Sequence, residues 1–175
     1  MLAAVKQKTP RASRGTFAII ASRYNARYVD AMVKAAQQQL KKAGAKTIRV
    51  IRVPGAFEIP AVAARLAQST NAWSAIICLG VILRGQTDHA QQIADAVSAS
   101  LAQLQIQRAL PIIHEVLLLE NEAQASVRCL DKKHNRGTEA AQTALEMARI
   151  MAGLSGDQPS EASKRCGMWG RGLGV

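Results

Sequence analysis

The chain of 175 residues is 49% hydrophobic and 20% charged, which fits one folded domain of ordinary size and excludes a disordered polymer. No apolar run is long enough to cross a bilayer, and the three widely spaced cysteines form neither a zinc motif nor a disulfide framework. We therefore expect a cytoplasmic protein without a membrane or metal site, whose net charge of +11 favours anionic partners such as nucleic acid or phosphorylated metabolites.

The two ends of the chain differ in composition from its middle. Residues 1–15 are basic and show no helical or strand periodicity, so we expect a flexible N-terminal arm. An organellar transit peptide is the alternative, because this segment contains Arg and Ser but no acidic residue. Residues 155–175 are rich in Gly and Ser and predict an irregular tail, which leaves residues 16–154 as the folded domain.

Four short apolar runs without clean alternation alternate with segments of helical periodicity. Strands buried on both faces have such runs, which indicates a parallel sheet covered by helices. The expected strands are 16–21, 47–53, 74–81 and 111–119, and the expected helices are 29–40, 59–68, 89–108, 121–130 and 138–152. With right-handed crossovers, this order predicts a three-layer α/β/α sandwich with a four-stranded parallel sheet, doubly wound and flavodoxin-like.

The first two strand ends carry candidate binding residues, because ligands of such sheets lie beyond the carboxyl ends of the strands. After the first strand, Tyr24 could stack on a heteroaromatic ring, or it is a surface tyrosine that covers the core. After the second strand, Gly55 allows close approach of a ligand to the backbone. Glu58 lies where the next helix begins, and it either meets a ligand or complements the helix dipole.

The third strand end combines a glycine loop with a histidine. Beyond Gly85, the amides of Gln86 and Thr87 are placed to bind an anion at the start of a helix, where Asp88 could equally be an ordinary cap. His89 falls in the first turn, where the helix dipole favours its neutral form. A neutral imidazole beside an anion site is a candidate general base, and an exposed helix-end histidine is the alternative.

The fourth strand carries polar residues, and charged residues follow it. His114 and Glu115 interrupt an apolar run and need polar partners or a wet cavity. Downstream, Arg128 and the basic stretch at 132–136 could bind phosphate or form a solvated face. A nucleic-acid site would add aromatic platforms to this charge, but the six aromatic residues do not interleave with the basic ones.

Taken together, four segments resemble the 6,7-dimethyl-8-ribityllumazine synthase family over residues 15–154, nearly the whole folded part. These segments are SRYN at 22–25, RVPGAFEIP at 52–60, LGVILRGQTDH at 79–89 and HNRGTEAA at 134–141. The resemblance implies a transferase of riboflavin biosynthesis. Its members condense 5-amino-6-(D-ribitylamino)uracil with 3,4-dihydroxy-2-butanone 4-phosphate in the penultimate step of the pathway, without cofactor or metal. A divergent paralogue that binds lumazine or flavin with little turnover is the alternative.

The resemblance also implies roles for individual residues. His89 corresponds to the proton-transfer histidine and Glu139 to a carboxylate that supports it. The expected substrate-binding residues are Tyr24, Ala56, Phe57, Glu58, Val81, Ile82, Leu83, Gln86, Thr87, His114 and Arg128. The chain departs from the family's usual residues at Gln86, Asp88, His114, Glu115 and Arg136; at the last three positions the family commonly has Phe, Gly and Lys.

The family's assembly implies that the active sites lie between subunits of a homo-oligomer. We expect a pentamer as the unit, with Arg128 completing the site of a neighbour, and riboflavin synthase as a further partner. The segment at 128–137 has no insertion, which favours a shell of 60 subunits over a free pentamer or decamer. The positive charge and the two basic ends oppose a shell.

Overall fold

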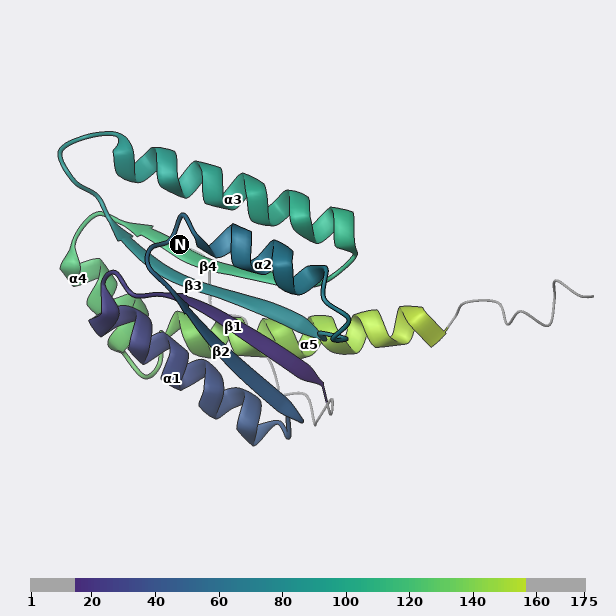
Figure 1. Ribbon diagram of the computed structural model, residues 1–175. Helices are drawn as coiled ribbons and strands as arrows, with labels where there is room; N and C mark the ends of the chain where they lie inside the picture. The colour runs from purple at the N-terminus through teal and green to yellow at the C-terminus, as the bar shows by residue number, and fades with distance from the viewer. Residues whose placement is uncertain (1–14, 157–175) are drawn as a thin grey trace, which may run out of the picture.

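Four parallel strands form one sheet in the order β2-β1-β3-β4 in the computed structural model, which describes residues 15–156 (Figure 1). The strands are β1 (Thr16–Ser22), β2 (Thr47–Val53), β3 (Ala75–Leu83) and β4 (Ile112–Leu119). β1 pairs with β2 on one side and with β3 on the other, and β4 pairs with β3. All four carboxyl ends therefore meet at one edge of the sheet, as the sequence predicts.

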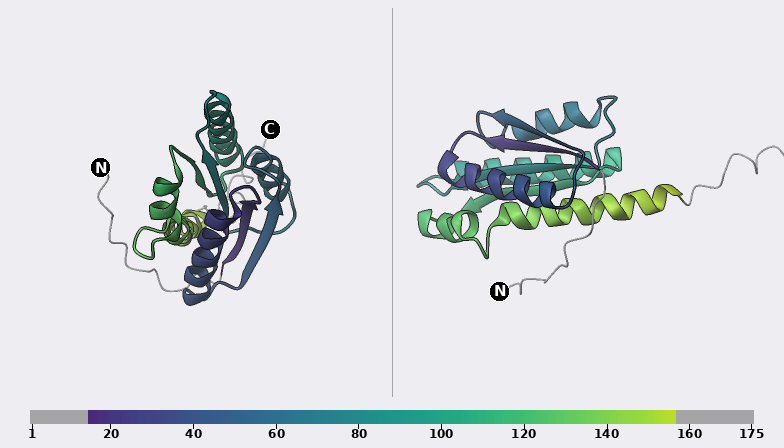
Figure 2. Two further views of the ribbon diagram at one scale, coloured as in Figure 1. Left: turned by 90° about the vertical axis from the view of Figure 1, so that its left-hand side faces the viewer. Right: turned by 90° about the horizontal axis from the view of Figure 1, so that it is seen from below.

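Helices cover both faces of the sheet and complete three layers, which confirms the predicted fold class (Figure 2). One face packs against α1 (Ala26–Lys42) and α5 (Arg136–Gly156), and the other packs against α2 (Ile59–Ala67) and α3 (His89–Arg108). Successive side chains of a strand point to opposite faces. In β1 the side chains from Phe17 to Ala21 are fully buried, so both of its faces lie in a core.

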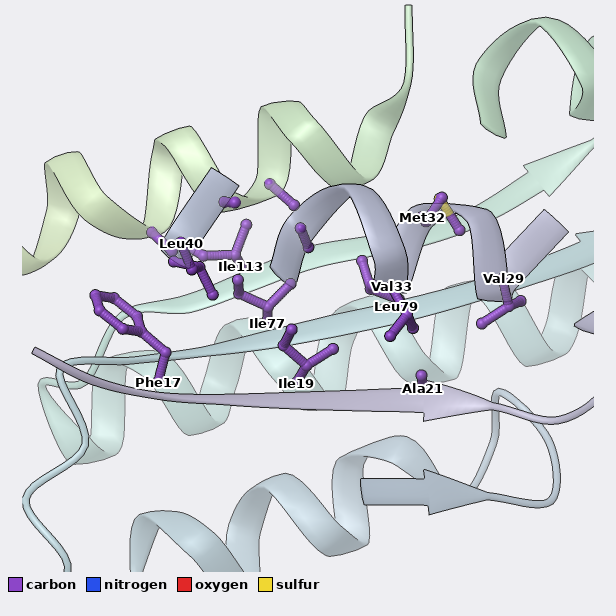
Figure 3. Close-up of a cluster of buried hydrophobic side chains, with 14 of the residues drawn as sticks. Phe17, Ile19, Ala21, Val29, Met32, Val33, Leu40, Ile77, Leu79 and Ile113 are labelled. Atoms are coloured by element: carbon purple, nitrogen blue, oxygen red, sulfur yellow. The ribbon is translucent and has the colours of Figure 1, made fainter. Parts of the chain in front are cut away.

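The larger core lies between the sheet, α1 and α5. Phe17 and Ile19 of β1 point into it together with Leu79 of β3, and Met32 and Leu40 of α1 meet them (Figure 3). The helical spacing of the apolar residues in α1 puts them on one buried stripe. Full burial of side chains of this size stabilises the fold by about 1.5–3 kcal/mol each. The core therefore fixes how the carboxyl ends of β1 and β3 sit beside each other.

Beyond shifts of a few residues at the ends of β1, α1, α2 and β4, three differences from the predicted elements stand out. β3 continues through Leu83, two residues beyond its predicted end, because it pairs with β4 to that point. The single helix predicted at 121–130 is a short α4 (Glu122–Ala125) followed by the π-helical turn η1 (Ser126–Leu130). α5 runs to Gly156 and thus past the predicted start of the tail at 155. The expected arm at 1–14 and the remaining tail at 157–175 lie outside the described residues.

None of the helices between residues 15 and 156 combines the length and apolar character that a membrane span requires.

Candidate active site

The loops after β1 and β2 are tied together at the carboxyl edge of the sheet. The amides of Arg23 and Tyr24 both donate to the carbonyl of Pro54, at 3.1 Å. Asn25, in the left-handed region at φ 56°, donates its side-chain amide to the carbonyl of Val81 at 2.8 Å. Hydrogen bonds therefore link the first loop to the second loop and to the end of β3.

Gly55 allows the second loop to pass close to Tyr24. A Cβ at Gly55 would lie 3.0 Å from the Tyr24 ring and 3.0 Å from a carboxylate oxygen of Glu58. The Gly55 amide instead donates to that Glu58 oxygen at 2.8 Å. This bond holds the Glu58 carboxylate at the start of α2 through one of its two oxygens.

These loops form one wall of a cleft of about 850 Å³. The other walls are the end of β3 and the first turns of α3. The lining residues are Tyr24, Asn25, Gly55, Ala56, Phe57, Glu58, Val81, Ile82, Leu83, His89, Gln92, Ile93 and Ala96. Tyr24 is 70% exposed and Phe57 is 60% exposed, so two aromatic side chains that could cover a planar ring stand among the lining residues.

The loop between β3 and α3 is anchored at its start and leads into the cleft. The Arg84 amide donates to the Leu119 carbonyl at 2.9 Å, and the Arg84 side chain pairs with Glu120 at 3.0 Å. The next residues, Gln86 and Thr87, are exposed. They do not line the cleft, but they lie in the chain between Leu83 and His89, which do. A ligand that fills the cleft therefore has this loop at one end.

His89 is the first residue of α3 and is exposed. Asp88 occupies the cap position, but its side chain makes no capping hydrogen bond. Capping by the Asp88 carboxylate therefore does not occupy the first amides of α3. Free amides at a helix start favour an anion.

The structure brings eight of the predicted site residues together around the cleft: Tyr24, Ala56, Phe57, Glu58, Val81, Ile82, Leu83 and His89. Sequence reasoning did not assign five further lining residues to the site: Asn25, Gly55, Gln92, Ile93 and Ala96. Three of these follow His89 at helical spacing, so the periodicity of α3 could have identified them. Asn25 and Gly55 stood in the loops already identified.

His114 lies elsewhere. Its Nε2 is 2.8 Å from the Ser98 hydroxyl on α3, and its Nδ1 accepts a hydrogen bond from the Val116 amide at 3.1 Å. An accepting Nδ1 puts the proton of the neutral ring on Nε2, which donates to Ser98, and Ser98 donates to the Ala94 carbonyl. Burial lowers the pKa of His114. Both ring nitrogens are thus engaged inside the chain, and His114 does not reach the cleft of its own subunit.

Arg128 and Glu139 also lie away from that cleft. Arg128 lines a second cavity of about 460 Å³, together with Leu119, Ala123, Gln124 and Val127. Glu139 pairs with Arg136 at the start of α5. Two of the predicted functional side chains therefore lie on a part of the surface that is separate from the cleft. If they act on the same substrates as His89, they must act from another copy of the chain.

Comparison with known proteins gives one consistent result. The family model of 6,7-dimethyl-8-ribityllumazine synthase matches residues 14–152. A protein of that name from Xanthomonas euvesicatoria pv. vesicatoria is 43% identical over 143 residues, covering 81% of this chain and 92% of the relative. One from Xanthomonas oryzae pv. oryzae is 44% identical over 137 residues, which cover 77% of this chain and 88% of the relative. One from Stenotrophomonas maltophilia is 41% identical over 149 residues, which cover 84% of this chain and 94% of the relative.

Proposed function

The chain belongs to the 6,7-dimethyl-8-ribityllumazine synthase family, and we propose that the cleft beside Tyr24 and His89 is its half of a shared active site. The protein is a transferase of riboflavin biosynthesis. It condenses 5-amino-6-(D-ribitylamino)uracil with 3,4-dihydroxy-2-butanone 4-phosphate to form 6,7-dimethyl-8-ribityllumazine, the penultimate step of the pathway.

The reaction requires several proton transfers between two bound substrates. The amino nitrogen of the pyrimidine adds to the ketone and water leaves, which gives an imine. Removal of a proton next to the imine expels phosphate from the adjacent carbon, and the ribitylamino nitrogen closes the ring with loss of a second water. A positioned imidazole accelerates such steps by about 10²–10⁴-fold, and holding both substrates on one surface contributes further.

The composition of the cleft is the observation that supports this assignment. Tyr24 and Phe57 offer aromatic surface to a pyrimidine ring, and the Glu58 carboxylate accepts hydrogen bonds from the hydroxyls of a ribityl chain. The backbone at Val81 to Leu83 faces the ring from the end of β3. His89 stands at the far wall, next to the loop whose Gln86 and Thr87 amides are proposed to bind the phosphate.

The surface that carries Arg128 and Glu139 completes the active site of a neighbouring subunit. The family works as homo-oligomers, and we assign Arg128 and Glu139 to the site of the adjacent chain. Arg128 supplies a guanidinium for the phosphate, and Glu139 supports His89 of the neighbour. The absence of both residues from the cleft of their own chain favours this arrangement. The pentameric ring, association with riboflavin synthase and a cytoplasmic location belong to the same proposal.

Mixing the two substrates with purified protein tests the function. Formation of the lumazine, followed by its absorbance and fluorescence, is the expected result. A protein that is purified with a yellow ligand and does not turn over would instead identify a binding paralogue. A band shift of DNA with a steep salt dependence and no turnover would identify a nucleic-acid-binding domain.

A further inference from the structure

Glu115 and Arg136 form a bidentate ion pair between the sheet and α5. Glu115 of β4 accepts two hydrogen bonds from Arg136 of α5: one from Nε and one from Nη2, both at 2.9 Å. The Glu115 side chain is 10% exposed and that of Arg136 is 31% exposed. A bidentate pair of this kind fixes both the position and the plane of the guanidinium.

The start of α5 holds Arg136 on a rigid base. Asn135 is buried, and its side-chain oxygen accepts hydrogen bonds from the amides of Gly137 and Thr138. Its side-chain nitrogen donates to the carbonyl of Cys129, so the helix start is joined to η1. The backbone of Gly137 lies directly against α1. The main chain of Arg136 therefore has little freedom, and the Glu115 carboxylate fixes the rest of the side chain.

Arg136 also reaches the predicted catalytic carboxylate. Its third nitrogen, Nη1, donates to Glu139 one helical turn further along α5. One guanidinium thus bridges Glu115, which is buried in the sheet face, and Glu139, which is 40% exposed. The pKa of Glu115 is also lowered by the cation Arg128 of η1 and raised by the nearby carboxylate of Glu139. Glu115 in turn raises the pKa of the Cys129 thiol in η1.

We propose that Glu115 is a positioning residue for catalysis, which holds Arg136 so that Arg136 holds Glu139 toward the neighbouring subunit's site. This inference rests on the proposed role of Glu139. Glu115 and Arg136 act through Glu139, and neither has to touch substrate.

The ion pair with Arg136 does not fully offset the cost of burying Glu115. Burial raises the pKa of Glu115, and the attraction of Arg136 lowers it only in part. Removing one partner of a buried ion pair destabilises a fold when the other charge is left without a partner. In Glu115→Gln, Arg136 keeps its bond to Glu139 and is already 31% exposed, so the variant should fold with a somewhat lower melting temperature than the natural protein. Its amide nitrogen donates, so it cannot accept both Arg136 hydrogen bonds.

The test compares Glu115→Gln with Glu146→Gln. Glu146 forms a similar pair with Arg149 on the same helix, at 2.6 Å, in an exposed position away from the cleft and from Glu139. We expect Glu115→Gln to lower kcat about tenfold with less than about twofold change in either KM, because a small misplacement of a catalytic group has effects of this size or larger. Glu146→Gln should match the natural protein.

Dependence on pH separates positioning from a structural role. As the pH falls, Glu115 becomes protonated, so the kcat of the natural protein should approach that of Glu115→Gln. In a double-mutant cycle, Arg136→Lys should lower kcat similarly, and Glu115→Gln with Arg136→Lys together should be no worse than either alone. If Glu115→Gln fails to fold, Arg136→Lys alone tests whether loss of the pair with Glu115 lowers kcat.

Three outcomes overturn the inference: an unchanged kcat in both single variants, a kcat ratio that does not vary with pH, or effects that multiply in the double variant. A natural protein without synthase turnover would instead count against the proposed function.

Discussion

At the residue scale, removal of the His89 side chain should lower kcat while leaving substrate binding nearly unchanged. It lines the cleft at the first position of α3, next to the proposed phosphate loop. We expect His89→Ala to lower kcat by about 10²-fold, the lower end of the range for general acid–base catalysis, because substrate proximity persists. The KM for the phosphate substrate should change by less than about twofold.

Steady-state kinetics with both substrates varied provides the measurement, and His134→Ala is the matched control. His134 is exposed in the loop before α5 and does not line the cleft. If His89→Ala weakens binding of both substrates and leaves the chemical step intact, His89 does not transfer protons.

His114 should make the stability of the fold depend on pH. Its pKa is lowered in the folded state by burial, so the unfolded chain binds the proton more readily. Its contribution is therefore complete at neutral pH and is lost as the pH falls below about 6.5, with a slope of at most about 1.4 kcal/mol per pH unit. His114→Phe lacks this proton, and its stability relative to the natural protein should rise on going from about pH 7.5 to pH 5.5.

Chemical denaturation of both proteins at the two pH values measures the difference. A relative stability that stays constant with pH would show that burial does not lower the pKa of His114 in the folded state.

At the scale of elements, the contact between α5 and α1 depends on a glycine. A Cβ at Gly137 would lie 2.1 Å from the carbonyl oxygen of Met32, so Gly137→Ala must push the helices apart. We expect a loss of about 3 kcal/mol or more in the free energy of unfolding. Gly153 lies on the same helix, and a Cβ there would meet no atom within 4 Å. Gly153→Ala should therefore be stabilising by about 0.5 kcal/mol.

Urea titration of the two variants gives the comparison. Equal stability of Gly137→Ala and Gly153→Ala would show that the contact between α1 and α5 tolerates a side chain.

The sequence predicted elements better than it predicted contacts between them. The four strands could be predicted because buried parallel strands have continuous apolar runs. The predicted end of β3 was wrong because Ile82 and Leu83, although apolar, were assigned to the loop motif that follows. The interrupted geometry of η1 leaves no signal in apolar spacing. Successive side chains of β4 point to opposite faces of the sheet, so His114 contacts α3 and Glu115 contacts α5. The sequence does not show which helix covers which face, so these partners could not be predicted.

The lining of the cleft could be predicted where its residues follow one another along a loop, and could not be predicted where it depends on tertiary placement. The lining residues from Ala56 to Glu58 and from Val81 to Leu83 follow from their motifs. The bridge from Glu115 through Arg136 to Glu139 does not, because its members come from a strand and a helix that only the fold brings together.

At the scale of the whole molecule, the short connection between η1 and α5 bears on assembly. It consists of residues 131–135, and we infer that so short a connection favours association of the proposed pentamers into a shell. The net charge of +11 per chain opposes it unless anions are bound. We expect light scattering in phosphate buffer at moderate salt to give a mass above ten chains. A mass of five or ten chains would exclude the shell.

A shared active site makes a sharper prediction, because two impaired variants should partly restore each other's activity. A chain with His89→Ala has an impaired cleft but keeps Arg128 for its neighbour. A chain with Arg128→Ala keeps an intact cleft but offers its neighbour no arginine. In a ring built at random from equal amounts of the two chains, about one quarter of the interfaces join an intact cleft to an intact Arg128. At a phosphate-substrate concentration near the natural KM, co-expressed chains purified together through different tags should therefore recover about one quarter of the natural rate per site, whereas the separately purified variants stay far below it. Mixed rings no more active than the average of the two variants would mean that Arg128 acts within its own chain or that the phosphate binds elsewhere.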